Sequence, residues 1–161
     1  MSFDAAAVAA AEELSFLSFT SNDAFELGSR IRATIAAHPS GRAALVDIVT
    51  ASGQRLFFAT SGEGTQPDNA EWARRKRASV LRWGKSTASL NVKWPGGAVP
   101  SAYGINEADY ACHGGGFPIR VKGVEPIIGT IVVSGLAQED DHQVIVDNVE
   151  KYIQEQQAAQ K

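Results

Sequence analysis

The last third of the chain constrains its fold most, because a glycine-rich segment there leads into two β-branched runs. Three consecutive glycines, Gly114–Gly116, stand just before Pro118. Glycine allows positive φ and the close approach of another group, while Pro118 fixes φ and removes one N–H. The runs 117–121 and 127–134 predict strands, and Gly123 between them predicts a turn, so the two strands form an antiparallel hairpin.

The rest of the chain alternates between helical and strand patterns. The apolar run 43–49 and the run 55–59 flank Ser52-Gly53, which predicts a second hairpin. Apolar residues at helical spacing and capping residues at the starts predict helices. The predicted helices cover 4–16, 20–38, 68–85 and 138–156, while 91–103, with Pro95-Gly96-Gly97, is expected to be an extended loop.

These elements predict an α+β protein in which helices flank an antiparallel sheet, with a profilin-like or PAS-like sandwich as the nearest shape. A length of 161 residues suits one globular domain. We expect this domain to span 1–161, with an N-terminal helix within 1–20 and a frayed tail at 157–161.

Composition excludes several functional classes. The net charge is −3, which gives no general case for nucleic-acid binding, although six of the fifteen Lys and Arg lie between Arg74 and Lys85. Cys112 is the only cysteine, so no intrachain disulfide can form and a reducing compartment fits. The N-terminus lacks the basic region of a signal peptide, and the longest apolar run, 127–133, is far shorter than the roughly 20 residues of a membrane helix. We therefore expect a cytoplasmic protein with no membrane or nucleic-acid partner.

Two short motifs resemble catalytic ones but are incomplete. The segment His113-Gly114-Gly115-Gly116-Phe117 resembles the oxyanion-hole motif of some esterases, yet no Gly-x-Ser-x-Gly accompanies it. Gly84-Lys85-Ser86-Thr87 ends like a phosphate-binding loop, but Ser79 stands where that loop needs its first glycine. Neither motif supports its activity here.

Histidines and neighbouring charges supply the candidate site residues. His38 stands beside Pro39 in a turn and is expected to be structural, whereas His113 and His142 have glycine-rich and acidic neighbours. Either imidazole could be an axial haem ligand or a proton donor; their spacing matches no zinc site. Asp141 could stabilise the start of the last helix, or orient His142 or a ligand.

The basic run Arg74-Arg75-Lys76-Arg77 covers every face of its predicted helix. Most of these cations are expected to be solvated or to meet the acidic tail of another subunit. Arg75 or Lys76, on the side of Trp72 and Trp83, could instead bind a carboxylate or phosphate.

In combination, the segments 72–76, 113–119 and 129–136 and the pair Asp141-His142 resemble the haem-degrading-domain family, which contains GlcG-like and HbpS-like proteins. The similarity is strongest to its branch of small single-domain proteins. It implies a profilin-like sandwich, assembly into dimers or larger rings, and a pocket for haem or another small molecule. The matching positions are Trp72, Arg75, Lys76, His113, Gly115, Phe117, Pro118, Ser134, Gly135, Asp141 and His142.

The leading interpretation is a cytoplasmic homo-oligomer with a small-ligand pocket for haem or an organic anion. The expected pocket residues are His113, Gly114, Gly115, Phe117, Arg75, Lys76, Asp141 and His142, with His113 or His142 as axial ligand if haem binds. No other metal is expected. A non-enzymatic interaction or adaptor protein, using the basic helix 74–85 and the acidic C-terminal helix, is the alternative. An enzyme acting on a small carboxylate is a third reading, and it requires one of these histidines to titrate abnormally within a cleft.

Overall fold

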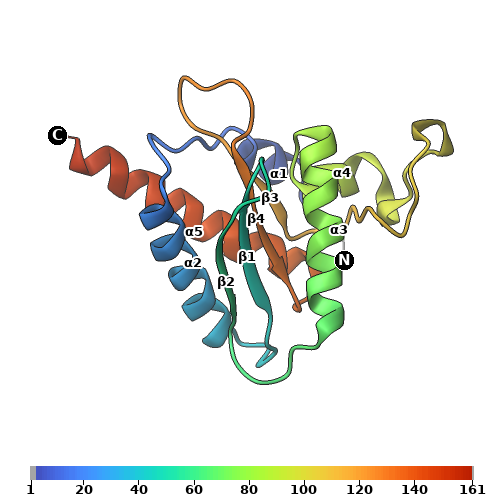
Figure 1. The fold of residues 1–161 in the computed structure, drawn as a ribbon, viewed down its shortest axis with the longest axis horizontal. Helices are drawn as coiled ribbons and strands as arrows, with labels where there is room; N and C mark the ends of the chain where they lie inside the picture. The colour runs from blue at the N-terminus through green and yellow to red at the C-terminus, as the bar shows by residue number, and fades with distance from the viewer. Residues whose placement is uncertain (1–2, 161) are drawn as a thin grey trace.

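A four-stranded antiparallel sheet with the strand order β2-β1-β4-β3 organises the computed structural model, which describes residues 3–160. Helices cover both faces: α2 and α5 lie on one, and α3 with the shorter α4 lies on the other (Figure 1). The α+β class with an antiparallel sheet flanked by helices is confirmed. The elements are α1 (Ala5–Ala11), α2 (Ser21–Ala36), β1 (Leu45–Thr50), β2 (Arg55–Thr60), α3 (Pro67–Trp83), α4 (Thr87–Lys93), β3 (Gly116–Ile119), β4 (Gly129–Ser134) and α5 (Gln138–Ala159), with single 3₁₀ turns at Pro95–Gly97 and Ser101–Tyr103.

The two central strands, β1 and β4, have both faces buried. Their side chains alternate between the two helical layers because successive residues of a strand point to opposite faces. Val46, Ile48 and Ile131 join the main core with α2 and α5, whereas Leu45 and Val132 pack with Ala73 of α3. The sheet therefore separates a large apolar core from a layer in which polar groups lie beside α3.

Local sequence explains where α2 and α3 begin. The Thr20 side chain accepts from the Asp23 backbone N–H and the Asp23 carboxylate accepts from the Thr20 N–H at 2.7 Å, which is a capping box at the predicted helix start. Helix α3 begins at Pro67, just before the predicted start, and the Asn69 side chain accepts from the Gln66 N–H at 2.8 Å. At the N-terminus of each of these two helices, a side chain thus accepts a hydrogen bond from a backbone N–H group.

Three boundaries differ from the prediction. Helix α1 stops at Ala11, because the chain then lies along the end of the β3–β4 hairpin, where the Phe16 N–H donates to the Arg120 carbonyl at 2.8 Å. Helix α4 overlaps the expected loop 91–103 and begins where the Ser86 side chain accepts from the Ser89 N–H. Helix α5 continues through 159 instead of fraying at 157; residue 161 lies outside the described range.

The segment after α4 forms an aromatic cluster on α3. Trp83 contacts Trp94, Tyr103 and Tyr110 edge to face, with ring centroids 5.3 to 6.0 Å apart. Cys112 follows this segment and is 2% exposed, packed with Leu90 and Trp94. Among residues 3–160, no helix is long and apolar enough to cross a membrane.

Candidate functional site

The glycine segment, Gly114–Gly116, passes directly over a buried ion pair. Gly115 has φ +122°, and a Cβ there would lie 2.7 Å from the Lys76 Nζ and 2.9 Å from the Asp141 Cβ. Its carbonyl accepts from the Val133 N–H at 2.8 Å. A side chain at this position would therefore displace the pair, so glycine is required both by its φ and by the space.

Lys76 and Asp141 form that pair between α3 and α5. The Nζ lies 3.2 Å from the Asp141 Oδ2 and donates to the Val133 carbonyl at 3.0 Å. Asp141 also accepts from the backbone N–H groups of Gly135 at 3.3 Å and Leu136 at 2.9 Å. Both side chains are at least 96% buried, and burial lowers the pKa of Lys76 and raises the pKa of Asp141.

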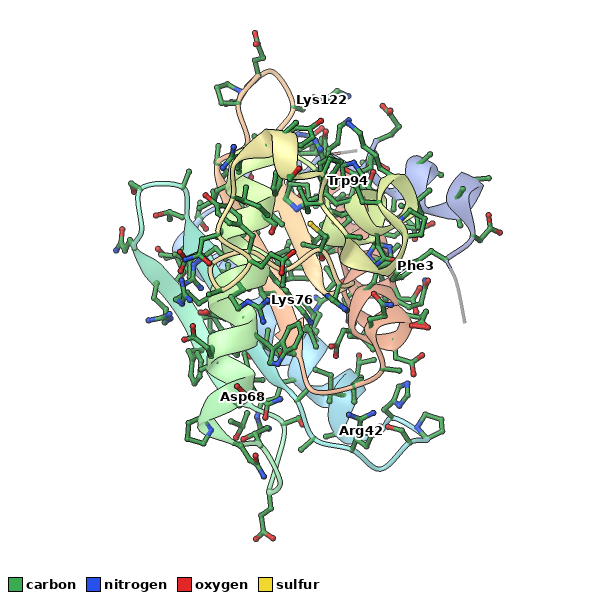
Figure 2. The ribbon with its side chains drawn as sticks, turned by 90° about the vertical axis from the view of Figure 1, so that its right-hand side faces the viewer. Phe3, Arg42, Asp68, Lys76, Trp94 and Lys122 are labelled. Atoms are coloured by element: carbon green, nitrogen blue, oxygen red, sulfur yellow. The ribbon has the colours of Figure 1, made fainter. Side chains whose placement is uncertain are left out.

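A cavity of about 350 Å³ opens beside this pair. It lies between α3, the β4–α5 turn and the glycine segment, and Figure 2 shows Lys76 and Arg42 on the face that carries it. Its volume falls near the lower end of the range for small-ligand pockets, roughly 300–1,000 Å³. The lining residues are Arg42, Asn69, Trp72, Lys76, His113, Ser134, Gly135, Leu136, Gln138 and Asp141.

The lining presents mainly hydrogen-bond donors. Asn69 uses its side-chain oxygen to accept from the Gln66 N–H, and Gln138 uses its oxygen to accept from the Gly114 N–H at 2.9 Å. Each amide therefore keeps its NH₂ group free. The Arg42 guanidinium makes no hydrogen bond or ion pair with any side chain or backbone group in the described range.

His113 forms one wall of the cavity. Its ring meets Trp72 edge to face at 5.2 Å, and the Arg75 guanidinium lies over the same Trp72 ring at 4.6 Å. The Nδ1 atom is buried and has no hydrogen-bond partner among residues 3–160. Burial, followed by the charges of Lys76 and Arg75, lowers the pKa of His113, so the ring is neutral near pH 7.

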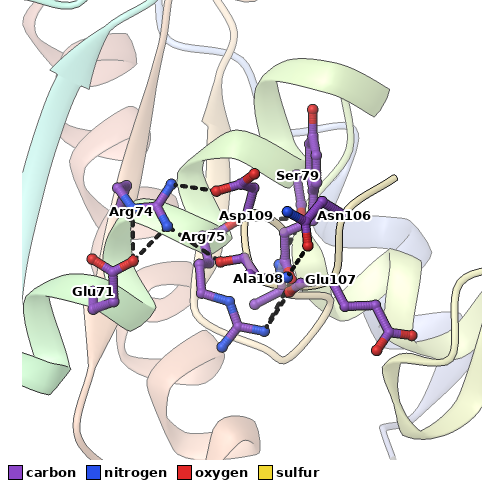
Figure 3. A network of polar contacts seen from close by, with 10 residues as sticks. Glu71, Arg74, Arg75, Ser79, Asn106, Glu107, Ala108 and Asp109 are labelled. Atoms are coloured by element: carbon purple, nitrogen blue, oxygen red, sulfur yellow. Dashed lines mark hydrogen bonds and ion pairs between the residues drawn. The ribbon is translucent and has the colours of Figure 1, made fainter. Parts of the chain in front are cut away.

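The basic helix α3 uses its cations within the chain (Figure 3). Arg74 bonds the Glu71 carboxylate and lies 3.3 Å from Asp109, and Arg75 donates to the Glu107 carbonyl at 2.9 Å. Arg77 lies 2.8 Å from the buried carboxylate of Asp47. Lys76, one of the two cations expected to be able to bind a carboxylate, is 3% exposed and pairs with the carboxylate of Asp141 in the same chain.

The structure separates three further candidates from the cavity beside Lys76. His142 is 4% exposed and faces a second cavity, of about 360 Å³, between α1 and α5. Phe117 is buried in the main core and lies 6.1 Å from the His142 ring, measured between centroids. Arg75 lines a separate hollow that shares His113 with the main cavity.

Lys76, His113 and Asp141 thus line one cavity, with Gly114 and Gly115 directly behind it. Sequence reasoning did not select Arg42, Asn69 or Gln138. Asn69 and Gln138 stand at helix starts, where a capping role explains them, and no sequence signal marks Arg42, which lies in a loop.

The sequence and the fold agree with a known family. The family described as "Haem degrading protein HbpS-like" matches residues 19–150. The chain belongs to this family. A UPF0303 protein of Burkholderia pseudomallei is 40% identical over 136 residues, which is 83% of this chain and 79% of that protein.

Solved structures with the same fold extend the comparison. The crystal structure of the Ybr137w protein superposes with a TM-score of 0.87 at 29% identity, covering 96% of this chain and 90% of that one. A crystal structure of a PduOC:heme complex superposes with a TM-score of 0.64 at 21% identity, covering 84% and 94%. The second similarity concerns the fold alone.

Proposed function

We propose that this HbpS-like protein binds a small organic anion in the cavity beside Lys76. The observation that carries the proposal is the Arg42 guanidinium, which lines the cavity without a partner among the described residues. Lys76 and Asp141 cancel each other's charge and His113 is neutral near pH 7, so Arg42 leaves the lining with a net positive charge.

The free donors favour a carboxylate. An arginine fork matches the two oxygens of a carboxylate, and the free amide groups of Asn69 and Gln138 add donors. Trp72 and Leu136 supply apolar surface for the body of the ligand. A compact aromatic or aliphatic monocarboxylate meets each of these requirements.

Isothermal titration with benzoate tests the proposal, with neutral benzamide as the ligand control. Charge-assisted hydrogen bonds contribute about 1.5–3 kcal/mol, so Arg42→Gln is expected to weaken benzoate binding about 10-fold or more. Lys122→Gln is the matched control, because it removes one exposed positive charge from the distant β3–β4 loop. Equal effects of the two variants, or equal affinities for benzoate and benzamide, would contradict the proposal.

Haem is a second candidate, and the state of His113 favours it. A neutral imidazole without a protein partner can coordinate iron, and Arg42, in the same lining, could bind a propionate. A structure of a PduOC:heme complex has this fold. The lining supplies a ligand for the iron in His113, but it offers the flat porphyrin ring little apolar surface, since only Trp72 and Leu136 are large apolar residues there.

A haemin titration followed by the Soret band distinguishes the two ligands. A saturable shift with one haemin per chain, lost in His113→Ala and kept in His142→Ala, would place haem at the cavity beside Lys76. Loss in His142→Ala alone would move it to the other cavity. A weak, unsaturable shift in all three proteins would exclude haem and leave the anion proposal standing.

Two other interpretations, an interaction or adaptor protein and an enzyme acting on a small carboxylate, differ in how well the described residues support them. The interaction or adaptor interpretation depended on free cations in 74–85, and Arg74, Arg75, Lys76 and Arg77 are bonded within the chain. An enzyme acting on a small carboxylate required a histidine that titrates abnormally in a cleft, and His113 meets that condition. A reaction would use the same ligand site.

We also propose a cytoplasmic homo-oligomer as the working form. Phe58 is 48% exposed on the edge strand β2, whose free edge and apolar side chain suit contact with a second copy. Light scattering coupled to gel filtration tests the assembly: Phe58→Asp is expected to lower the mass, and a monomeric wild-type chain would contradict it.

A further inference from the structure

The second cavity, between α1 and α5, differs from the cavity beside Lys76 in both shape and charge. Helix α1 makes its main contacts with α4 and not with α5. The gap that remains, about 360 Å³, is lined by Phe3, Ala7, Val8, Leu14 and Val146, with His142 among them. Figure 2 labels Phe3 on this side of the molecule.

His142 is the buried polar residue of this lining, which also contains Asp4, Gln143 and Glu150. Its Nδ1 atom is buried and makes no hydrogen bond to the described part of the chain. The Phe3 ring holds the imidazole edge to face at 5.7 Å, and Phe117 lies on another side at 6.1 Å. A buried polar atom without a hydrogen bond costs free energy unless a ligand or water supplies one.

Charge and size define what can fill the gap. Asp4 and Glu150 line it, so a carboxylate ligand is disfavoured. Burial lowers the pKa of His142 to about 4, so the ring is neutral near pH 7 and offers one acceptor and one donor. Apolar protein cavities of about 150 Å³ hold a benzene ring, so this larger one has room for a substituted aromatic molecule.

We infer that the cavity between α1 and α5 is a second ligand site, which takes a compact uncharged aromatic molecule with one hydroxyl group. The hydroxyl bonds an imidazole nitrogen of His142, and the ring packs among Phe3, Leu14 and Val146. The alanines of α1 leave the space that the ring occupies. This site is independent of the proposed anion site.

Phenol and benzene are the probes, because they differ only in the hydroxyl group. By titration calorimetry, phenol is expected to bind saturably with one molecule per chain, about 3- to 10-fold more tightly than benzene. His142→Phe keeps an aromatic ring in place and should reduce phenol affinity to that of benzene. Arg42→Gln should leave phenol binding unchanged, which separates this site from the anion site.

Two alanines of α1 provide a matched pair of blocking variants. Ala7 and Ala9 are both exposed, but only Ala7 lines the cavity. Ala7→Trp is therefore expected to abolish phenol binding and Ala9→Trp to preserve it, with thermal unfolding confirming that both variants fold. Absence of saturable binding, equal affinities for phenol and benzene in the wild type, or equal effects of the two tryptophans would overturn the inference.

Discussion

Removing either partner of the Lys76–Asp141 pair should destabilise the protein with opposite dependences on pH. Lys76→Met leaves the Asp141 carboxyl buried with only the Gly135 and Leu136 N–H groups as partners. The carboxyl group can become neutral by binding a proton, and this sets an upper limit on the loss in free energy of unfolding. With an unfolded pKa of about 3.9, that limit is about 4 kcal/mol at pH 7 and about 1.5 kcal/mol at pH 5.

Asp141→Asn gives the converse case. Asparagine can still accept from the Leu136 N–H, but the Lys76 ammonium loses its counter-ion. It can become neutral by releasing a proton, at a cost limited to about 4.6 kcal/mol at pH 7 and about 2 kcal/mol at pH 9 for an unfolded pKa of about 10.4. The loss of stability therefore shrinks as pH rises, whereas for Lys76→Met it shrinks as pH falls.

Urea unfolding at pH 5, 7 and 9, followed by tryptophan fluorescence, measures these losses relative to the wild type at each pH. The double variant should lose less than the sum of the single losses, since neither charge is left alone. Arg74→Met removes a cation from exposed ion pairs with Glu71 and Asp109 and serves as the control, for which little change is expected. Losses independent of pH, or equal to that of the control, would refute the reasoning.

Other substitutions test separate features. Because burial lowers the folded pKa of His142 to about 4, its neutral form contributes stability that is present above the unfolded value of 6.5 and lost as pH falls toward 4. The free energy of unfolding should drop by about 2 kcal/mol between pH 7.5 and pH 5, and His142→Phe should remove that part of the slope. Gly115→Ala should cost well over 1 kcal/mol, because its Cβ would overlap the Lys76 Nζ, whereas Gly104→Ala, at positive φ but in open space, should cost about 1 kcal/mol by thermal unfolding. Asp47→Ala removes the buried carboxylate that Arg55 and Arg77 bind, and because both arginines can then be hydrated it should cost about 1.5–3 kcal/mol in urea; a loss below 0.5 kcal/mol would contradict that role.

The regular elements followed from local chemistry that the sequence displays. The capping box at Thr20 and Asp23 and the Ser52-Gly53 turn predicted a helix start and a hairpin that the structure contains. Helix α4 was missed because Pro95-Gly96-Gly97 dominated the interpretation of 91–103, although Ser86 already offered a cap for 87–93. Strand order was not predictable, since it depends on contacts far apart in sequence.

The candidate site was predictable only in part, for a geometric reason. Asp141 and His142 are adjacent on α5, and adjacent residues of a helix point about 100° apart. Asp141 therefore faces Lys76 while His142 faces α1, so one expected pocket became two. The burial of Lys76 among three arginines was likewise hidden, because the run gives no sign of which cation faces the sheet.

Because Cys112 is buried, the rate at which a thiol reagent modifies it measures how often the surrounding structure opens. The thiol is packed with Leu90 and Trp94, and burial raises its pKa, so the reactive thiolate is scarce while the native contacts hold. A thiol reagent can therefore modify it only in molecules in which the α4 layer has separated from α3. When the layer closes faster than the reagent reacts, the modification rate of Cys112 divided by the modification rate of a cysteine in an unfolded peptide equals the equilibrium constant for opening of that layer. As the sole cysteine, it reports this local stability without an engineered probe.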